Sequence, residues 1–342
     1  MADATHRPRH HTSRGFRNNH PTDAHGGLDL LRWLPGFLLK PHRKPHFSVR
    51  PPPVEQLRTN RTQDTLTWIG HSTFLLQLSG RNLVTDPHFS ERASPLAFAG
   101  PRRLAPPALR AEDLPPLHIA LVSHNHYDHL DEPSVRRLAR LHPDLTFVVP
   151  LGLGRWFARR RIARVVELDW WQHADIAGLR VHAVPAQHFS GRGLRDRDAT
   201  LWCGFVVETP TRRVYFAGDT GYCPDFAEIG ARFAPIDLSL LPIGAYEPRW
   251  FMRYMHANPE DAVRIHRDVG SQLSVAMHWG TFRLTEEPLD EPPQRLRRAL
   301  DAAGLPPERF QVFQHGESRV LWPSAHATED SHAACSNSSE SA

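Results

Sequence analysis

Residues 123–131, SHNHYDHLD, constrain this 342-residue chain more than any other stretch. They place His124, His126 and His129 within six positions, together with Asp128. Imidazole is a poor filler of a protein core, so packing does not explain such a cluster. Neutral imidazole nitrogen and carboxylate oxygen are, however, the ligands that zinc takes. On one turning loop, His124 and His126 can face one ion while Asp128 and His129 face a second.

The residues on either side predict that this loop joins a strand to a helix. Residues 117–122, LHIALV, have the apolar character of a short buried strand. Asp131, followed by Pro133, predicts a helix cap with proline at the first helical position. Loops held by rigid elements commonly carry chemistry, and we therefore expect the ligands to lie at a strand end.

Three further candidates follow later apolar runs, His188 in RVHAVPAQHF, Asp219 in RRVYFAGDTGY and His278 in SVAMHWGTF. Each alone is more typical of a hydrogen-bonded core or surface residue. Strand ends that meet at one rim would nevertheless bring them to the first loop. Two zinc sites then become complete, one with His124, His126 and His188, the other with Asp128, His129 and His278, and with Asp219 bridging both.

The remaining sequence predicts an α/β protein with polar ends. Strand-like and helical stretches alternate over residues 64–322 without a repeat period, which is typical of one compact α/β domain. Residues 1–27 and 323–342 are polar and lack periodicity, so we expect disordered tails. Residues 28–63 form an N-terminal arm, in which the apolar run LDLLRWLPGFLL is broken by Pro35 and followed by Lys40, Arg43 and Lys44.

Composition excludes several classes of protein. The net charge is only +4, and the arginines are scattered without interleaved aromatic residues, which argues against a nucleic-acid-binding surface. No run approaches the roughly eighteen apolar residues of a membrane-spanning helix. Cys203, Cys223 and Cys335 have no paired spacing, which predicts reduced thiols and a cytoplasmic location. Richness in Arg, Ala and Pro is typical of a GC-rich bacterial genome.

The order HxHxDH, then His, then GDT, then His resembles the metallo-β-lactamase superfamily, whose fold is a four-layer αβ/βα sandwich. Within that superfamily the chain resembles the N-acylphosphatidylethanolamine-hydrolysing phospholipases D from about Thr65 to Arg319, with a weaker echo reaching back to Phe16. The strings that carry this resemblance are TWIGHSTFLLQ, TDPHFSERASP, SHNHYDHLD, VPLGL, ELDWW, FAGDTGYCPDF, PIGAYEPRWFM and HWGTF.

The resemblance implies a zinc-dependent phosphodiesterase that converts N-acylphosphatidylethanolamine to N-acylethanolamine and phosphatidic acid. It implies two zinc ions per chain on the seven residues above, and a homodimer. It places Tyr127 and His256 near the substrate, where His256 would orient or protonate the leaving group. Asp128 and His256 are thus the catalytic candidates. Without the resemblance, the sequence favours a packed tyrosine for Tyr127 and a histidine flanking a helix for His256.

Two more residues are candidates for supporting the ligands. Asp86, in LVTDP at a strand end, is predicted to accept a hydrogen bond from a metal-binding imidazole, because such imidazoles usually need a partner. His71 either does the same or has a structural role.

Fold and metal ligands do not fix the substrate, so other readings stay open. Hydrolysis of another phosphodiester, a lactone or a lactam is an alternative, and a non-catalytic metal-binding module is a further one that predicts missing ligands. A phospholipid substrate implies work at a bilayer. We therefore expect peripheral association with a membrane surface through the N-terminal arm. The alternative is that the leucines of the arm cover the domain core.

Overall fold

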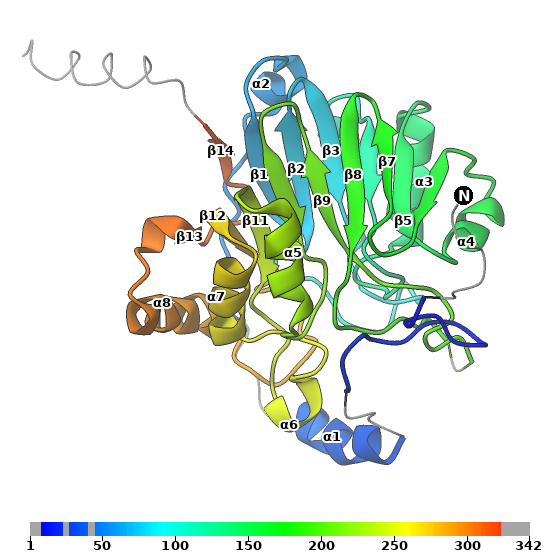
Figure 1. The fold of residues 1–342 in the computed structure, drawn as a ribbon, viewed down its shortest axis with the longest axis vertical. Coiled ribbons are helices and arrows are strands. Elements are labelled where there is room, and N and C mark those ends of the chain that lie inside the picture. The colour runs from blue at the N-terminus through cyan, green and yellow to red at the C-terminus, as the bar shows by residue number, and fades with distance from the viewer. Residues whose placement is uncertain (1–7, 23–26, 40–44, 194, 323–342) are drawn as a thin grey trace, which may run out of the picture.

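The structure, a computed structural model, describes residues 8–22, 27–39, 45–193 and 195–322. Two seven-stranded sheets pack face to face, with helices against their outer faces (Figure 1). The expected four-layer αβ/βα sandwich is therefore confirmed. The predicted C-terminal tail lies outside the described residues, as do Lys40, Arg43, Lys44 and Cys335.

The first sheet has the strand order β14-β1-β2-β3-β4-β5-β6. Its strands are β14 (Ser318–Val320), β1 (Thr65–Gly70), β2 (Thr73–Leu78), β3 (Arg81–Thr85), β4 (Ile119–Leu121), β5 (Thr146–Pro150) and β6 (Val165–Leu168). Helices α2 (Val54–Thr59), α3 (Glu132–Leu141) and α4 (Gly154–Ala158) contribute to the hydrophobic cluster on its outer face. A short 3-10 helix, Ala111–Asp113, lies in the same region of the chain.

The second sheet has the order β13-β12-β11-β10-β9-β8-β7. Its strands are β13 (Phe310–Gln311), β12 (Ser271–Met277), β11 (Ile236–Pro242), β10 (Arg213–Phe216), β9 (Gly204–Glu208), β8 (Leu179–Val184) and β7 (His173–Ile176). Helices α5 (Asp225–Phe233), α7 (Pro259–Asp268) and α8 (Glu291–Ala303) pack with it, and Pro307–Arg309 forms a second 3-10 helix. Helices α1 (Gly27–Leu39) and α6 (Arg249–Met252) project together from the sandwich (Figure 1).

Burial on both faces explains why central strands such as β4 read as apolar runs. In β4, Ile119 and Leu121 belong to the core between the two sheets. Ala120 and Val122 instead face the outer cluster that includes Val135 of α3. Successive side chains of a strand point to opposite faces, so a sheet covered on both faces needs apolar residues at every position.

Strand direction brings the candidate ligands to one edge. β3 and β4 are parallel, and so are β10, β11 and β12, so in each sheet these strands end on the same side. Asp86 follows β3 and His124 follows β4, while Asp219 follows β10 and His278 follows β12. The expectation that strand ends deliver these residues to a common rim agrees with this topology.

Several local expectations need correction. The strand expected at 117–122 is confined to Ile119–Leu121, and Asp131 caps α3 with Pro133 at its second rather than first position. Pro35 does not break the apolar run, because it lies inside the continuous helix α1. A proline removes one helical hydrogen bond and can bend a helix without ending it. Among the described residues, no helix combines the length and apolarity needed to cross a bilayer.

The prediction of a disordered tail over residues 1–27 is wrong for residues 8–22, which we call the N-terminal strap. Its backbone bonds to the domain, as in the bond from the Phe16 N–H to the Asp198 carbonyl (2.8 Å). Its polar side chains also find partners there, including Asp169 for His10. A polar segment can be ordered when its hydrogen-bonding groups are paired, and composition does not reveal partners distant in sequence.

Candidate metal centre

The loop after β4 carries the first candidate ligands and turns sharply between them. The N–H groups of His129 and Leu130 both bond to the carbonyl of His126, at 3.2 and 2.8 Å. This turn lets side chains on either side of Tyr127 face different partners. His126 contacts the β8–β9 connection, whereas Asp128 contacts the β1–β2 turn and the end of β12.

Three imidazoles converge in the first cluster, which consists of His124, His126 and His188. The Nδ1 atom of His126 lies 2.9 Å from His124 Nε2 and 3.2 Å from His188 Nε2. Burial lowers the pKa of His124 well below its usual value, and lowers the pKa to about 4 for His126 and to about 3 for His188. Neutral rings that share one meeting point offer lone pairs to a cation.

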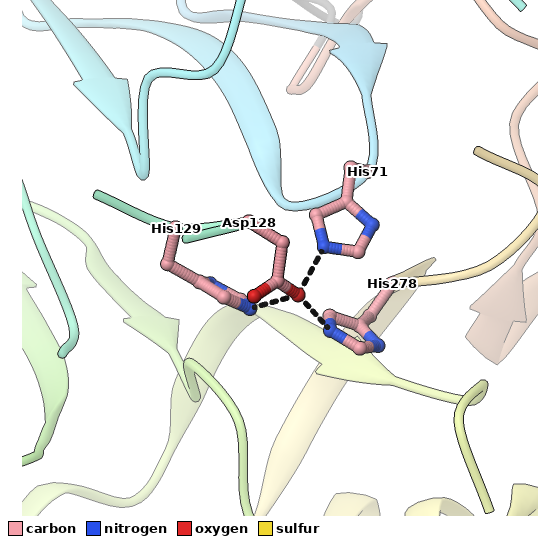
Figure 2. A group of neighbouring side chains, drawn as sticks. All are labelled: His71, Asp128, His129 and His278. Atoms are coloured by element: carbon pink, nitrogen blue, oxygen red, sulfur yellow. Dashed lines mark hydrogen bonds and ion pairs between the residues drawn. The ribbon is translucent and has the colours of Figure 1, made fainter. Parts of the chain in front are cut away.

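The second cluster surrounds one carboxylate oxygen (Figure 2). Asp128 Oδ2 lies 3.0 Å from His71 Nε2, 3.2 Å from His129 Nε2 and 3.3 Å from His278 Nε2. His71, expected as a supporting or structural residue, thus contacts Asp128 directly. The four ligand atoms lie close enough together to hold a metal ion.

Asp219 lies between the two clusters. Its Oδ2 atom is 3.1 Å from Nε2 of both His129 and His278 in the second cluster. The same atom is 4.0 Å from His124 Nε2 and 3.9 Å from His188 Nε2 in the first. Asp219 thus approaches imidazoles of both clusters through one oxygen, which is the position expected of a bridging carboxylate.

The protein groups do not satisfy one another fully, which fits a site built for cations. Oδ1 of Asp219 is buried without a hydrogen-bond partner. Although burial raises the pKa of Asp219, the neighbouring His129 and His278 hold that pKa well below its usual range. Burial also opposes protonation of His278, yet Asp219 and Asp128 raise the pKa of this imidazole to about 9. Divalent cations can replace such protons, because metal binding to histidine releases them.

Asp86 supports ligands on both sides of the centre, in the position proposed from the sequence. Its Oδ2 atom accepts a 2.6 Å hydrogen bond from His129 Nδ1. The Ser123 hydroxyl donates to the same carboxylate at 2.6 Å and lies 2.9 Å from His124 Nδ1. Such partners fix the orientation of a metal-binding ring. Ser123 was not recognised from the sequence, although its place before the first histidine was a usable signal.

The backbone around the centre is strained at residues that have side chains. His71, Asp86 and His278 have φ values of 55°, 31° and 60°, a region that side chains disfavour. Gly218, beside Asp219, has φ of 62°, and a Cβ atom there would lie 2.6 Å from Ser123 Cβ. The glycine is therefore needed for close approach of the two loops. Strain held at clustered polar residues is typical of functional sites.

The two residues expected near the substrate differ in their placement. His256 Nδ1 is buried without a hydrogen bond, 3.8 Å from Asp219 Oδ2, and burial lowers the pKa of this imidazole to about 3. The hydroxyl of Tyr127 instead donates to the Arg192 carbonyl at 3.0 Å, and the Arg192 guanidinium covers its ring at 3.9 Å. Tyr127 also lines a cavity of about 710 Å³ beside Asp131.

Arg192 holds together the two ends of the loop that carries the candidate ligands, a role that the sequence did not reveal. Its Nη1 atom donates to the carbonyls of Asn125 and Leu130, at 2.8 Å each. The two carbonyls flank the segment that carries His126, Asp128 and His129. One guanidinium therefore joins the ends of this segment. The contacts of Tyr127 and Arg192 are therefore those of a structural pair. Contact between Tyr127 and a substrate stays a prediction.

Comparison with known proteins agrees with this geometry. Residues 81–279 match the family described as "Beta-lactamase superfamily domain". The chain is 44% identical to N-acyl-phosphatidylethanolamine-hydrolyzing phospholipase D 1 of Caenorhabditis elegans, over 69% of each protein. It is 33% identical to the mitochondrial N-acyl-phosphatidylethanolamine-hydrolyzing phospholipase D of Saccharomyces cerevisiae, over 75% of this chain and 56% of the yeast protein.

Solved structures support the fold. The structure of Igni18, a metallo-hydrolase from the archaeon Ignicoccus hospitalis, superposes with a TM-score of 0.59 at 22% identity, over 77% of this chain and all of the archaeal one. The chain therefore belongs to the metallo-β-lactamase superfamily, as a metal-dependent hydrolase related to the N-acylphosphatidylethanolamine-hydrolysing phospholipases D.

Proposed function

We propose that the protein is a zinc-dependent phosphodiesterase of the phospholipase D type, which hydrolyses N-acylphosphatidylethanolamine to N-acylethanolamine and phosphatidic acid. The observation that carries this proposal is the pair of imidazole clusters joined by Asp219 Oδ2, 3.1 Å from His129 and His278 and within 4.0 Å of His124. Two adjoining sites with His and Asp ligands suit zinc and suit displacement at a phosphodiester. The names of the nematode and yeast relatives support this choice of substrate.

His124, His126 and His188 would hold one zinc ion and Asp128, His129 and His278 the other, with Asp219 shared. Zinc bound there supplies Lewis acidity towards a phosphoryl oxygen and lowers the pKa of water. His71 and Asp86 keep the second group of ligands in place through their contacts with Asp128 and His129.

The step in which His256 takes part is the departure of the alcohol. Water attacks phosphorus, the bond from phosphorus to the ethanolamine-side oxygen breaks, and that oxygen takes up the proton that the attacking water gives up. In this proposal His256 donates a hydrogen bond to the departing oxygen. Two observations support the role: its Nδ1 atom lies 3.8 Å from Asp219 Oδ2, and that atom has no hydrogen-bond partner among the described residues. We assign to it orientation of the leaving group, a contribution of the general acid–base type.

The test of the reaction is identification of the products. Purified protein is incubated with zinc and with N-acylphosphatidylethanolamine, phosphatidylcholine, a lactone and a lactam, and products are identified by mass spectrometry. We expect N-acylethanolamine and phosphatidic acid from the first substrate. In ¹⁸O-labelled water the label should enter phosphatidic acid, because attack occurs at phosphorus. Diacylglycerol or free fatty acid as main product would refute the bond assignment, and turnover of only the lactone or lactam would favour the alternative hydrolase.

We also propose that the protein docks on a membrane surface through helix α1. Leu28, Leu31 and Leu39 are 82%, 64% and 82% exposed, so these leucines do not cover the domain core. Their spacing places them near one face of the helix. A short apolar helix with an exposed face is suited to lie in the interface of a bilayer.

Helix α1 is attached beside the candidate site. Trp33 of α1 stacks on Phe251 of α6 with ring centroids 5.5 Å apart, and the guanidinium of Arg32 lies over the half-exposed ring of Trp250. His256 follows α6 by four residues. A bilayer that received α1 would thus meet the protein beside α6, the helix that precedes His256 in the chain (Figure 1).

Replacing Leu28, Leu31 and Leu39 together by serine should weaken binding to vesicles by on the order of a hundredfold or more. Burial of each leucine contributes about 1.5 kcal/mol or more. Co-sedimentation with phosphatidylethanolamine–phosphatidylglycerol vesicles measures the effect, and Leu141→Ser, at an exposed leucine of α3, is the matched control. Turnover of substrate dispersed in detergent should stay unchanged. Vesicle binding equal to that of the unmodified protein would show that α1 is not the docking element.

A further inference from the structure

The N-terminal strap is anchored to the domain by two adjacent histidines. His10 Nε2 lies 2.6 Å from Oδ1 of Asp169, and His11 Nε2 lies 2.7 Å from Oδ2 of the same carboxylate. The His10 ring also stacks on Trp170, with centroids 4.4 Å apart. We call His10, His11 and Asp169 the His–Asp clamp. Because Asp169 follows β6, the clamp fastens the strap to the end of the first sheet.

The ligand atoms of the clamp lie close enough together to hold a metal ion, but its two short contacts are hydrogen bonds between side chains. Each imidazole has its own carboxylate oxygen, at a distance normal for a charge-assisted hydrogen bond. In the second metal cluster, by contrast, three imidazoles crowd around a single oxygen of Asp128 at 3.0–3.3 Å. Side chains alone thus satisfy the clamp, and its role is to hold the strap.

Beyond the clamp, the strap presses against the loop that follows His188. Gly15 has φ of 158°, and a Cβ atom there would lie 2.0 Å from the carbonyl oxygen of Asp198. The next residue, Phe16, donates its N–H to that carbonyl at 2.8 Å. Only glycine permits this approach, which brings the following residues of the strap to the metal centre.

Asn18 is the residue of the strap that reaches a candidate ligand. Its Nδ2 atom donates to the carbonyl of His188 at 2.9 Å, and its Oδ1 atom accepts from the His188 N–H at 3.1 Å. Trp202 Nε1 donates to the same Oδ1 atom at 3.1 Å and so orients the amide. One side chain therefore holds both backbone groups of His188, while the imidazole Nδ1 of His188 bonds to the Met255 carbonyl at 2.8 Å.

We propose that Asn18 is a positioning residue of the metal centre, and that the strap sets the affinity for the ion held by His124, His126 and His188. The proposal rests on the ligand role proposed for His188. Metal–ligand distances in a well-formed site lie within about 0.2 Å of their standard values, so freedom of the His188 backbone reduces affinity. The other ion has its ligands on loops that Asn18 does not contact, and its affinity is expected to stay the same.

The experiment compares Asn18→Ala with Asn19→Ala in the full-length protein. Asn19 is the matched control, because its side chain bonds to Asp225 at 3.2 Å and not to His188. Zn²⁺ affinities are measured by titration against a chromophoric chelator, with His188→Ala as the reference for loss of one ion. Asn18→Ala should weaken one of two ions by about 10–100-fold, the usual effect of removing a partner of a ligand. Asn19→Ala should leave both affinities unchanged.

The possible results distinguish a failure of the strap proposal from a failure of the ligand role proposed for His188. Unchanged binding of both ions to His188→Ala would overturn the ligand role and, with it, the strap proposal. Loss of an ion in His188→Ala but not in Asn18→Ala would overturn the strap proposal alone. Equal weakening of both ions, with a lower melting temperature of the metal-free protein, would indicate general destabilisation and also overturn it.

A second variant tests the same proposal away from the site. Replacing His10 and His11 together by alanine releases the clamp and leaves Asn18 in place. We expect a several-fold weakening of the same ion, smaller than in Asn18→Ala, because the strap is then held only by its later contacts. This variant also decides the question if Asn18→Ala fails to fold, since an unchanged affinity would contradict coupling between strap and metal.

Discussion

Asp219→Asn is expected to weaken the binding of both metal ions at once and to lower kcat by on the order of a thousandfold, about 4 kcal/mol in the barrier. Asp219 Oδ2 is 3.1 Å from His129 and His278 and approaches His124 and His188 as well, so one substitution reaches both clusters. Asparagine keeps the shape of the side chain but removes the negative charge that a bridging ligand provides.

Metal content after gel filtration and steady-state turnover measure this effect. The control is Asp237→Asn, which removes a carboxylate that pairs with Arg212 near the start of β11. A matched loss of both ions in Asp219→Asn, with two ions retained in Asp237→Asn, is the expected pattern. Loss of a single ion would assign Asp219 to one site only. Retention of two ions with full turnover would remove it from the centre altogether.

The fold was predictable because burial on both faces leaves a strong signal. The apolar run that forms β4 carries residues for the inter-sheet core and for the outer cluster in alternation, and β11 and β12 have similar runs. The short edge strands β7 and β14 leave no such signal. Residues of β7 alternate between exposed and half-buried, and β14 is partly exposed, so neither has an apolar run.

The density of histidines in residues 123–131 made the first loop of candidate ligands evident. Contacts between distant segments were not visible in the sequence. His71 reaches Asp128 from the β1–β2 turn, 57 residues earlier in the chain. That contact depends on the positive φ of His71, which no residue pattern in TWIGHST announces.

The N-terminal strap is the clearest case of a partner hidden by sequence distance. His10 meets Asp169 across 159 residues, and Asn18 meets His188 across 170. Composition alone makes such a polar stretch look disordered, because the acceptors that pair with it belong to other elements. Gly15 did not identify the strap in advance, because a glycine can mark either a flexible segment or a close approach between two backbones. The structure shows the second case, with Gly15 against the carbonyl of Asp198.

His256→Ala is expected to lower kcat by about a hundredfold or more while leaving two metal ions bound. Its ring lies 5.1 Å from that of His188 and 5.5 Å from that of His278, so it borders both clusters. Within the described part of the chain, Nδ1 of His256 has no hydrogen-bond partner, which leaves this atom available to a substrate. Removal of a group that assists a leaving oxygen typically costs 10²–10⁴-fold.

Metal content decides between this role and direct metal binding. His188, Asp219 and His256 are close enough together to hold an ion as a group, so direct metal binding by His256 also has a geometric basis. Two ions retained with low kcat identify a residue that acts on the substrate. One ion lost in His256→Ala identifies a ligand. His256→Gln should recover part of the activity if a hydrogen-bond donor is what the reaction needs, and His173→Ala, at an exposed histidine of β7, should match the unmodified protein.

An alkyl phosphodiester whose leaving group is more acidic needs less help at the departing oxygen. With such a substrate the effect of His256→Ala should therefore shrink, and an undiminished effect would place His256 in metal binding or folding instead.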